Sequence, residues 1–129
     1  MQIITGTDER DFLEGTSEDE VIIGGAGNDQ LDGRGGSDIF VFGDDHGGDT
    51  ILGFGNNDRL DVSQITGVNS IEDLSITSTG LGTILVDIGD GNSIVLPFVN
   101  PEQLTEARFI FADGLMVRMA WITTKASGT

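Results

Sequence analysis

Acidic residues recur at nine-residue intervals through the first half of the chain. The series comprises Asp11, Glu20, Asp29, Asp38, Asp49 and Asp58, and its step widens once, by two residues, between Asp38 and Asp49. Two positions after each of these grid acids lies an apolar residue: Leu13, Ile22, Leu31, Phe40, Ile51 or Leu60. A short fixed period predicts a stack of structural repeats, and this prediction constrains the fold more than any other feature of the sequence.

The repeat divides residues 6–61 into six units, numbered first to sixth along the chain, with the grid acid at position six of each. The first six positions are polar and glycine-rich, which predicts a turn, because glycine adopts backbone angles that other residues resist. The last three positions have an apolar residue in the middle, which predicts a short strand with one side chain pointing inward. The units span residues 6–14, 15–23, 24–32, 33–41, 44–52 and 53–61.

A three-residue strand is stable only when it pairs with others, so two units are expected to form one coil of a parallel structure. The predicted fold class is all-β: a right-handed parallel β-roll of about three coils with a C-terminal β-rich cap. Stacking of the coils pairs Asp11 with Asp29 and Asp29 with Asp49 on one edge, and Glu20 with Asp38 and Asp38 with Asp58 on the other.

Carboxylates stacked about 4.8 Å apart, the spacing of paired strands, repel each other, and a hard cation between them converts the repulsion into coordination. Carboxylate and carbonyl oxygens favour Ca²⁺, which accepts six to eight flexible oxygen contacts, over Mg²⁺, which demands tight octahedral geometry. Zinc is disfavoured because the chain has no cysteine and one histidine. The stacked pairs predict about three to four calcium ions.

The chain of 129 residues carries 22 acidic and 6 basic residues, for a net charge of −16. Self-repulsion of that size opposes a compact state unless cations neutralise it. Nucleic acid is not expected as a partner, because binding it requires a basic surface. No stretch is apolar enough to span a bilayer, and the absence of cysteine excludes disulfides.

At the third unit the sequence resembles a known family. Residues 24–32, GGAGNDQLD, match every defined position of G-G-x-G-x-D-x-U-x, with U apolar, which is the RTX calcium-binding nonapeptide of parallel β-rolls. Four contiguous units and two more in register make this match specific. Residues 38–63 and shorter segments as far as residue 111 are similar to the C-terminal domains of serralysin-type proteases and to mannuronan epimerase R-modules.

The resemblance implies that the side chains of all six grid acids bind Ca²⁺. It also implies that turn carbonyls complete the coordination, at Gly24, Ala26, Gly33 and Gly35. The first coil departs from the family pattern, since Glu20 replaces an aspartate and Glu9 and Glu18 replace glycines. We therefore expect the first coil to bind calcium more weakly than the others, or not at all.

The nonapeptide pattern ends near residue 61. We expect a roll of residues 1–61 and a β-rich capping segment of residues 62–129, packed together as one domain. Strands are predicted over residues 74–78, 83–88, 93–96 and 108–112, with a capped helical turn near residues 69–73. Such a cap covers strand edges that would otherwise recruit other chains.

The tail joins an apolar segment, residues 115–122, to a polar end. We interpret the tail as a last strand or helix packed on the cap, and the alternative is a C-terminal secretion signal. Proteins that resemble this chain commonly leave the cell by type I secretion, which fits an N-terminus without a classical signal peptide. The expected localisation is therefore secreted and extracellular.

Catalytic motifs are not evident, so we expect no enzymatic activity and no catalytic residues. The only histidine, His46, lies in a predicted turn, where a solvated or ligand-adjacent role is favoured over catalysis. The sequence contains no H-E-x-x-H zinc motif, no G-x-S-x-G elbow and no P-loop.

Two functions remain in view. The favoured one is a module that folds on binding Ca²⁺ after secretion, as the C-terminal part of a bacterial protein with a covalently linked catalytic domain. The alternative is a Ca²⁺-dependent accessory module that binds an acidic polysaccharide such as alginate. Arg10, Arg34 and Arg59 do not share a repeat position, which makes the second function less favoured.

Overall fold

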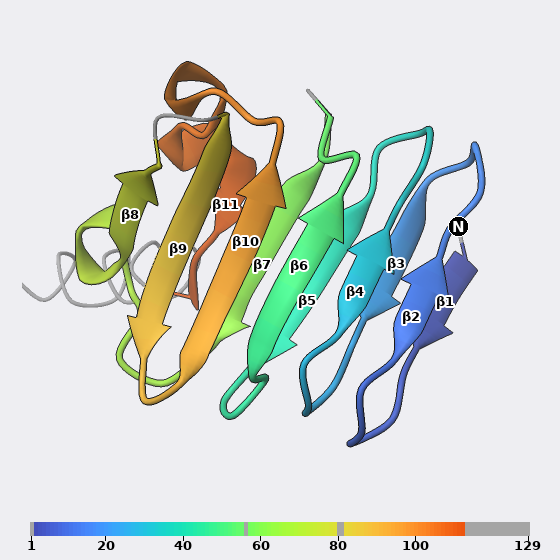
Figure 1. The fold of residues 1–129 in the computed structure, drawn as a ribbon, viewed down its shortest axis with the longest axis horizontal. Helices are drawn as coiled ribbons and strands as arrows, with labels where there is room; N and C mark the ends of the chain where they lie inside the picture. Colours follow the sequence, from blue (N-terminus) through green and yellow to red (C-terminus); the bar gives the residue numbers. More distant parts are fainter. Residues whose placement is uncertain (1, 56, 80–81, 113–129) are drawn as a thin grey trace, which may run out of the picture.

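The computed structural model describes residues 2–55, 57–79 and 82–112, which form two β-sheets facing each other across one apolar core (Figure 1). One sheet has the order β1 (Gln2–Thr5), β3 (Glu20–Ile23), β5 (Ile39–Gly43), β7 (Arg59–Gln64) and β11 (Phe109–Ile110). The other has the order β2 (Phe12–Glu14), β4 (Gln30–Asp32), β6 (Gly48–Leu52), β10 (Asn92–Pro97), β9 (Thr83–Gly89) and β8 (Ser75–Ser78).

Successive strands of the repeat region alternate between the two sheets, and each pairs in parallel with the strand one coil away. The register aligns equivalent positions, so that Leu31 lies between Leu13 and Ile51. The same alignment places Phe40 between Ile22 and Leu60 in the other sheet. These pairings confirm the predicted parallel β-roll of about three coils.

The apolar residue of each short strand points into the core, as its position two residues after the grid acid predicts. Five of these six side chains are fully buried: Ile22, Leu31, Phe40, Ile51 and Leu60. Complete burial of a side chain of this kind is worth about 1.5–3 kcal/mol, so this inward row is a main source of the stability of the roll.

The two-residue interruption of the period lengthens β5 instead of adding a loop. Phe42 is buried there, with its ring centroid 5.0 Å from that of His46, and the pairing with β7 shifts register between Val41 and Gly43. The extra residues therefore add an aromatic side chain to the core beside the turn of the fifth unit.

Beyond the third coil, both sheets continue into the second half of the chain. β10 adds in parallel to β6, β9 and β8 follow antiparallel, and β11 pairs with β7. Short 3-10 helices occupy Ile71–Asp73, Pro101–Gln103 and Glu106–Arg108. The predicted strands are confirmed, except that Arg108 ends a helix and the last strand covers only Phe109–Ile110. The tail, residues 115–122, lies outside the described residues.

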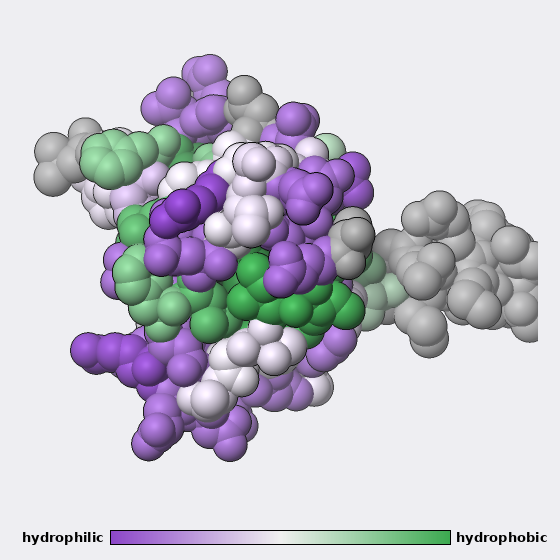
Figure 2. All heavy atoms as spheres, turned by 90° about the vertical axis from the view of Figure 1, so that its right-hand side faces the viewer, coloured by the Kyte–Doolittle hydropathy of each residue, from purple (hydrophilic) through white to green (hydrophobic). Residues whose placement is uncertain are grey.

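The opposite end of the roll is formed by β1 and β2, the outermost strands of the two sheets. Figure 2 looks onto this end and shows an apolar band between two hydrophilic faces. Ile3 and Phe12 are exposed there by 65% and 60% of their surface, and Leu13 is only half-buried.

Candidate metal centre

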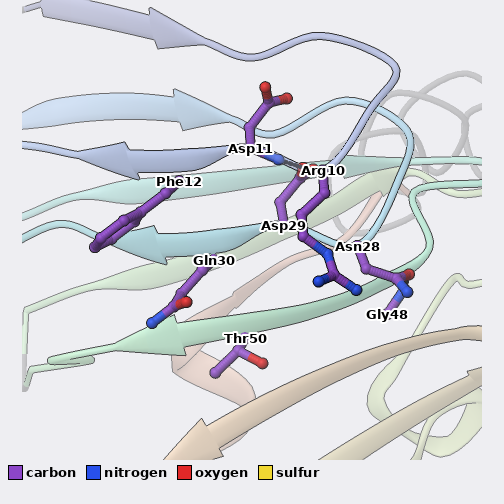
Figure 3. A pocket seen from close by; sticks show the side chains of 8 residues that line it. All are labelled: Arg10, Asp11, Phe12, Asn28, Asp29, Gln30, Gly48 and Thr50. Atoms are coloured by element: carbon purple, nitrogen blue, oxygen red, sulfur yellow. Dashed lines mark hydrogen bonds between the residues drawn. The ribbon is translucent and has the colours of Figure 1, made fainter.

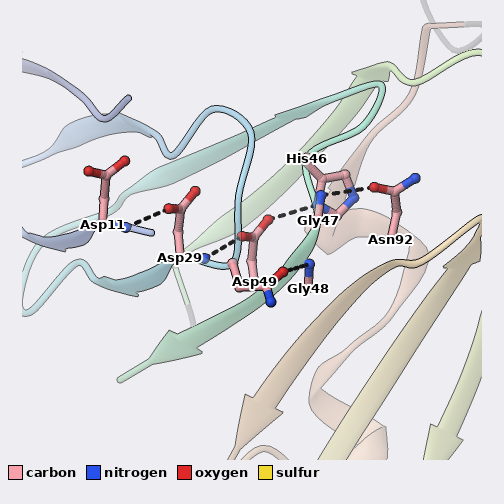
Figure 4. A network of polar contacts seen from close by, with 8 residues as sticks. Asp11, Asp29, His46, Gly47, Gly48, Asp49 and Asn92 are labelled. Atoms are coloured by element: carbon pink, nitrogen blue, oxygen red, sulfur yellow. Dashed lines mark hydrogen bonds and ion pairs between the residues drawn. The ribbon is translucent and has the colours of Figure 1, made fainter. Parts of the chain in front are cut away.

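The grid acids form two rows, one along each edge of the roll where the turns stack. In the first row, Asp11 donates its backbone N–H to Oδ1 of Asp29 over 2.8 Å, and Asp29 donates to Oδ1 of Asp49 over 2.9 Å (Figure 4). In the second row, Glu20 donates to Asp38 over 3.0 Å and Asp38 donates to Asp58 over 2.8 Å. The four predicted acid pairs are therefore neighbours in space.

The contact within each pair differs from the expected one, in which a cation lies between two carboxylates. One oxygen of the later acid is occupied by the peptide N–H of the earlier acid, which offsets part of the negative charge of the row. The first oxygen thus keeps only part of its acceptor capacity, and the second oxygen is the better candidate ligand for a cation.

In the middle coil, that second oxygen is buried and has no hydrogen-bond partner. Oδ2 of Asp29 and Oδ2 of Asp38 are the two carboxylate atoms of this kind among the described residues. Each faces the glycine that opens its own turn: a Cβ added to Gly24 would lie 2.6 Å from Oδ2 of Asp29, and one added to Gly33 would clash with Oδ2 of Asp38. Gly24 and Gly33 are also two of the four residues whose carbonyls were predicted to be ligands.

Burial raises the pKa of both carboxyl groups. The pKa of Asp29 rises to about 6 and that of Asp38 to about 7, mainly through desolvation, with the charges of Asp49 and Asp58 as further causes. A buried carboxylate oxygen without a donor is costly, and a hard cation removes that cost. The middle coil therefore fits Ca²⁺: it offers a buried anionic oxygen on each edge, next to glycines that leave room.

In the first coil, the acids are held by their own turns. The backbone N–H of Thr7 donates to Oδ2 of Asp11 over 2.6 Å, and Asp11 is half-buried. The backbone N–H and hydroxyl of Thr16 donate to the carboxylate of Glu20, which is fully buried. These contacts leave fewer free carboxylate oxygens in the first coil than in the second.

In the third coil, protein groups likewise contact the acids. Nδ1 of His46 lies 2.7 Å from Oδ2 of Asp49, and the imidazole is 3% exposed. The imidazole is thus buried against a grid acid, and the solvated alternative is wrong. On the other edge, the backbone N–H of Gly55 donates to Oδ2 of Asp58 over 2.7 Å.

Arg108 is the residue at this site that the sequence did not indicate. Its Nε donates to the carbonyl of Asp58 over 2.8 Å, and its Nη2 donates to the carbonyl of Gly55. Its guanidinium also lies 4.7 Å from the ring centre of Phe54. Arg108 is about 50 residues from this turn, so no local pattern could have connected the two.

The ligand assignment of the six grid acids and of Gly24, Ala26, Gly33 and Gly35 stays a prediction. In the described part of the chain, no three His, Asp or Glu side chains converge to hold a metal. A complete shell of about six to eight ligands around Ca²⁺ would therefore also need other oxygens, from backbone carbonyls or water.

A hollow of about 510 Å³ lies on the outer face of β2, β4 and β6, next to the first row of grid acids, and Asp11 and Asp29 are among the residues that line it (Figure 3). The register places Phe12, Gln30 and Thr50 in one row across these strands. Arg10 and Asn28 also line the hollow. The other two arginines of the repeat region lie elsewhere: Arg34 pairs with Glu14, and Arg59 lines a second hollow beside Arg108.

Comparison with protein families matches residues 5–40 and 14–48 to the RTX calcium-binding nonapeptide repeat, in four copies. Residues 5–48 thus consist of RTX calcium-binding nonapeptide repeats. The RTX repeat is a calcium-binding structural module and not a catalytic one. No curated protein sequence matches the chain significantly.

Solved structures share the fold. An extracellular lipase, LipA from Serratia marcescens, matches with a TM-score of 0.63 and 21% identity over 85% of this chain, which spans 21% of the lipase chain. The AlgE6R2 subunit of the mannuronan C5-epimerase from Azotobacter vinelandii matches with a TM-score of 0.64 and 23% identity, covering 84% of this chain and 92% of that one. The AlgE6R3 subunit of the same organism's mannuronan C5-epimerase matches with a TM-score of 0.61 and 23% identity, covering 86% of this chain and 78% of that one.

Proposed function

We propose that this chain, whose N-terminal part consists of RTX repeats, is a module that folds when it binds Ca²⁺. The observation that carries the proposal is the pair of buried, unpartnered carboxylate oxygens on Asp29 and Asp38. An anion in that position opposes folding until a cation reaches it. The carboxylates of Asp29 and Asp38 are then side-chain ligands, and turn carbonyls complete the coordination.

The expected energetics make the fold dependent on the ion. Extracellular calcium modules bind with dissociation constants of about 10⁻⁴–10⁻³ M. At a constant of about 10⁻⁴ M, about 10 mM Ca²⁺ stabilises the fold by roughly 2.7 kcal/mol per ion. Several ions then contribute as much as the total stability of a small domain, so the calcium-free chain is expected to be largely unfolded.

A circular-dichroism titration tests this proposal. The spectrum should change from disordered in excess EGTA to β-rich on addition of Ca²⁺, and Mg²⁺ at the same concentration should have a much smaller effect. A complete β spectrum in excess EGTA contradicts the proposal.

The proposed dependence of folding on Ca²⁺ also fits the proposal that the chain is secreted. Cytoplasm contains little free Ca²⁺, so the acidic repeats stay unfolded there and fold outside the cell, where the ion is abundant. The lipase with this fold is extracellular and carries it as about a fifth of its chain. That architecture supports a covalently linked catalytic domain as a partner. Among the described residues, no helix has the length and hydrophobicity to cross a membrane.

The roll, residues 1–61, and the cap, residues 62–129, are proposed to fold together as one domain. β7 crosses the boundary between them, and the buried apolar cluster contains residues from both sides of it. Limited proteolysis in Ca²⁺ should therefore leave the region around residue 61 uncut.

The second candidate function, binding of an acidic polysaccharide, is supported by the outer hollow. An exposed aromatic ring, Phe12, lies there beside the guanidinium of Arg10 and the amides of Asn28 and Gln30. A ring that can stack on a sugar, a cation for a carboxylate and amides for hydroxyls suit a polyuronate chain. Asp11 and Asp29 also line the hollow, and their charges repel a polyuronate unless Ca²⁺ neutralises them, so this binding is expected to require the ion.

Affinity electrophoresis in alginate gels, with and without Ca²⁺, tests the second candidate. Wild type should be retarded in Ca²⁺, and Arg10→Gln and Phe12→Ala should each reduce the retardation. Phe98→Ala is the matched control, because Phe98 is 91% exposed and is not among the residues that line the hollow. Equal retardation of all four chains excludes the hollow as the binding site.

A further inference from the structure

The six turns of the roll are not equivalent. In the third, fourth and fifth units, positions two and four both adopt positive φ: Gly25 and Gly27, Arg34 and Gly36, and Asp45 and Gly47. In the first and second units the same positions hold threonine and glutamate with ordinary φ. The family nonapeptide has glycines at these two positions, so the first coil lacks the turn that the third, fourth and fifth units form.

Unpartnered oxygens distinguish the turns further. Only the third and fourth units combine the positive-φ turn with a grid acid that is at most 3% exposed and has an oxygen without a donor in the described structure, namely Asp29 and Asp38. These two units make up one coil, and their acids lie on opposite edges of the roll.

The fifth unit keeps the turn but fills its interior with its own side chain. His46 occupies position three, where the third unit has Ala26 and the fourth has Gly35. Its imidazole is buried against Phe42, and Nδ1 contacts Oδ2 of Asp49, the oxygen that is free in the third unit.

The sixth unit is closed from outside the repeat. Arg108 donates to the carbonyls of Gly55, at position three, and of Asp58, at position six. A third donation, from Nη1 to the carbonyl of Gln103 over 3.0 Å, fixes the guanidinium to the cap. A permanent cation thus interacts with turn carbonyls that would otherwise be available to a metal ion.

We propose that the roll binds Ca²⁺ at only two strong sites, one at Asp29 and one at Asp38, the two acids with free buried oxygens. His46 and Arg108 take the place of the ion in the third coil, and the two threonines close the first coil. This inference rests on the proposed calcium function and narrows it, since the sequence alone predicted about three to four ions.

Ion counting on the complete chain is the primary test. Equilibrium dialysis with elemental analysis, together with isothermal titration, should find two strong sites, one for each free buried carboxylate oxygen of the described residues. Three or more ions of similar affinity overturn this inference but leave the calcium function intact. A chain that binds no Ca²⁺ overturns the proposed function itself.

Variants assign the ions to residues. Asp29→Asn and Asp38→Asn should each remove one ion, because asparagine keeps the Oδ1 acceptor but loses the charge. Asp49→Asn and Asp58→Asn are matched controls with the same chemical change, and each should leave the ion count unchanged. Loss of an ion in either control overturns the inference.

His46→Ala gives a test by gain of binding. The variant makes position three of the fifth unit identical to that of the third, where Ala26 stands. It should therefore add one strong Ca²⁺ site to the wild-type number. An unchanged ion count in folded His46→Ala overturns the role of His46, and the wild-type ion count remains decisive even if a variant does not fold.

Discussion

Asp38 donates its backbone N–H to Oδ1 of Asp58 over 2.8 Å, and this bond holds the two carboxyl groups one coil apart on the same edge of the roll. Burial of Asp38, and secondly the charge of Asp58, raise the pKa of Asp38 from 3.8 to about 7. Burial likewise raises the pKa of Asp29 to about 6. Both groups therefore hold protons more tightly in the folded chain than in the unfolded one.

The first prediction is that the calcium-free fold becomes less stable as pH rises. The two raised pKa values place the loss between about pH 4 and about pH 7, because the folded chain binds more protons than the unfolded chain in that window. The free energy of unfolding should fall by on the order of a few kcal/mol. Hydrogen bonds from Thr66 lower the pKa of Asp44, so Asp44 stabilises the fold as pH rises, which opposes the effect of Asp29 and Asp38. Asp44 is exposed, and solvent screens its contribution.

The fraction of folded chain in EGTA, followed by circular dichroism from about pH 7 down to about pH 4, measures the effect. The double variant Asp29→Asn, Asp38→Asn is the control, because asparagine does not titrate, and its stability should depend less on pH. An unchanged pH dependence in the double variant would show that these two groups are not responsible.

The second prediction concerns Gly27, at position four of the third unit, with φ of +87°. A Cβ at Gly27 would lie 2.7 Å from the carbonyl of Glu9 in the preceding coil, whereas Gly67, with the same φ, has nothing within 4 Å. Gly67→Ala should lower the free energy of unfolding by about 1 kcal/mol, through backbone strain alone. Gly27→Ala should lower it clearly more, because the added Cβ also clashes with the preceding coil. Chemical denaturation in saturating Ca²⁺ compares the stability of the two variants. Equal losses of stability would contradict the close stacking of the coils at Gly27.

The third prediction concerns the inward row. Phe40 is fully buried, between Ile22 and Leu60, so Phe40→Ala should destabilise the calcium-bound fold by about 3–5 kcal/mol. Phe98→Ala removes the same atoms from a residue that is 91% exposed and should change stability by less than about 0.5 kcal/mol. Urea unfolding of both variants in Ca²⁺ decides the matter, and similar losses would argue against Phe40 as a core residue.

The fourth prediction concerns the link between the cap and the last turn. Arg108→Met removes three hydrogen bonds to backbone carbonyls and should cost about 2–4 kcal/mol in saturating Ca²⁺. Arg59→Met is the control, because Arg59 is exposed and its change should lie within about 0.5 kcal/mol. Calorimetry compares the two, and a stable Arg108→Met variant would show that the guanidinium does not hold the cap in place.

Periodicity was sufficient to predict most of the fold. Each apolar residue two places after a grid acid is an inward residue, and the coil spacing correctly paired Asp29 with Asp11 and Asp49. These features are local: the chain geometry of one short unit, repeated, sets which side chains face inward and which turns stack. The strands of the cap lie outside the repeat, and they could be predicted from another local signal, short segments of β-prone residues separated by turn residues.

Differences among the turns were only partly visible in the sequence. The unusual residues of the first coil predicted weaker binding, and the threonine contacts to Asp11 and Glu20 are a physical reason to expect it. Arg34 adopts a positive φ of 61° at a position where the pattern has glycine, so the fourth unit forms the same turn with a residue type that rarely adopts this conformation. The residue type alone did not predict this.

The sequence by itself determined the repeat, the inward row, the two rows of carboxylates and the preference for an oxygen-binding cation, because all of these follow from spacing and residue chemistry. Only the tertiary structure decided which carboxylate oxygens remain free. His46 turns inward onto Asp49, and Arg108 reaches the last turn from a distant part of the chain. Hydrogen-bond satisfaction depends on which groups the folded chain brings within about 3 Å, and that is a property of the packed coils and cap, not of any single repeat.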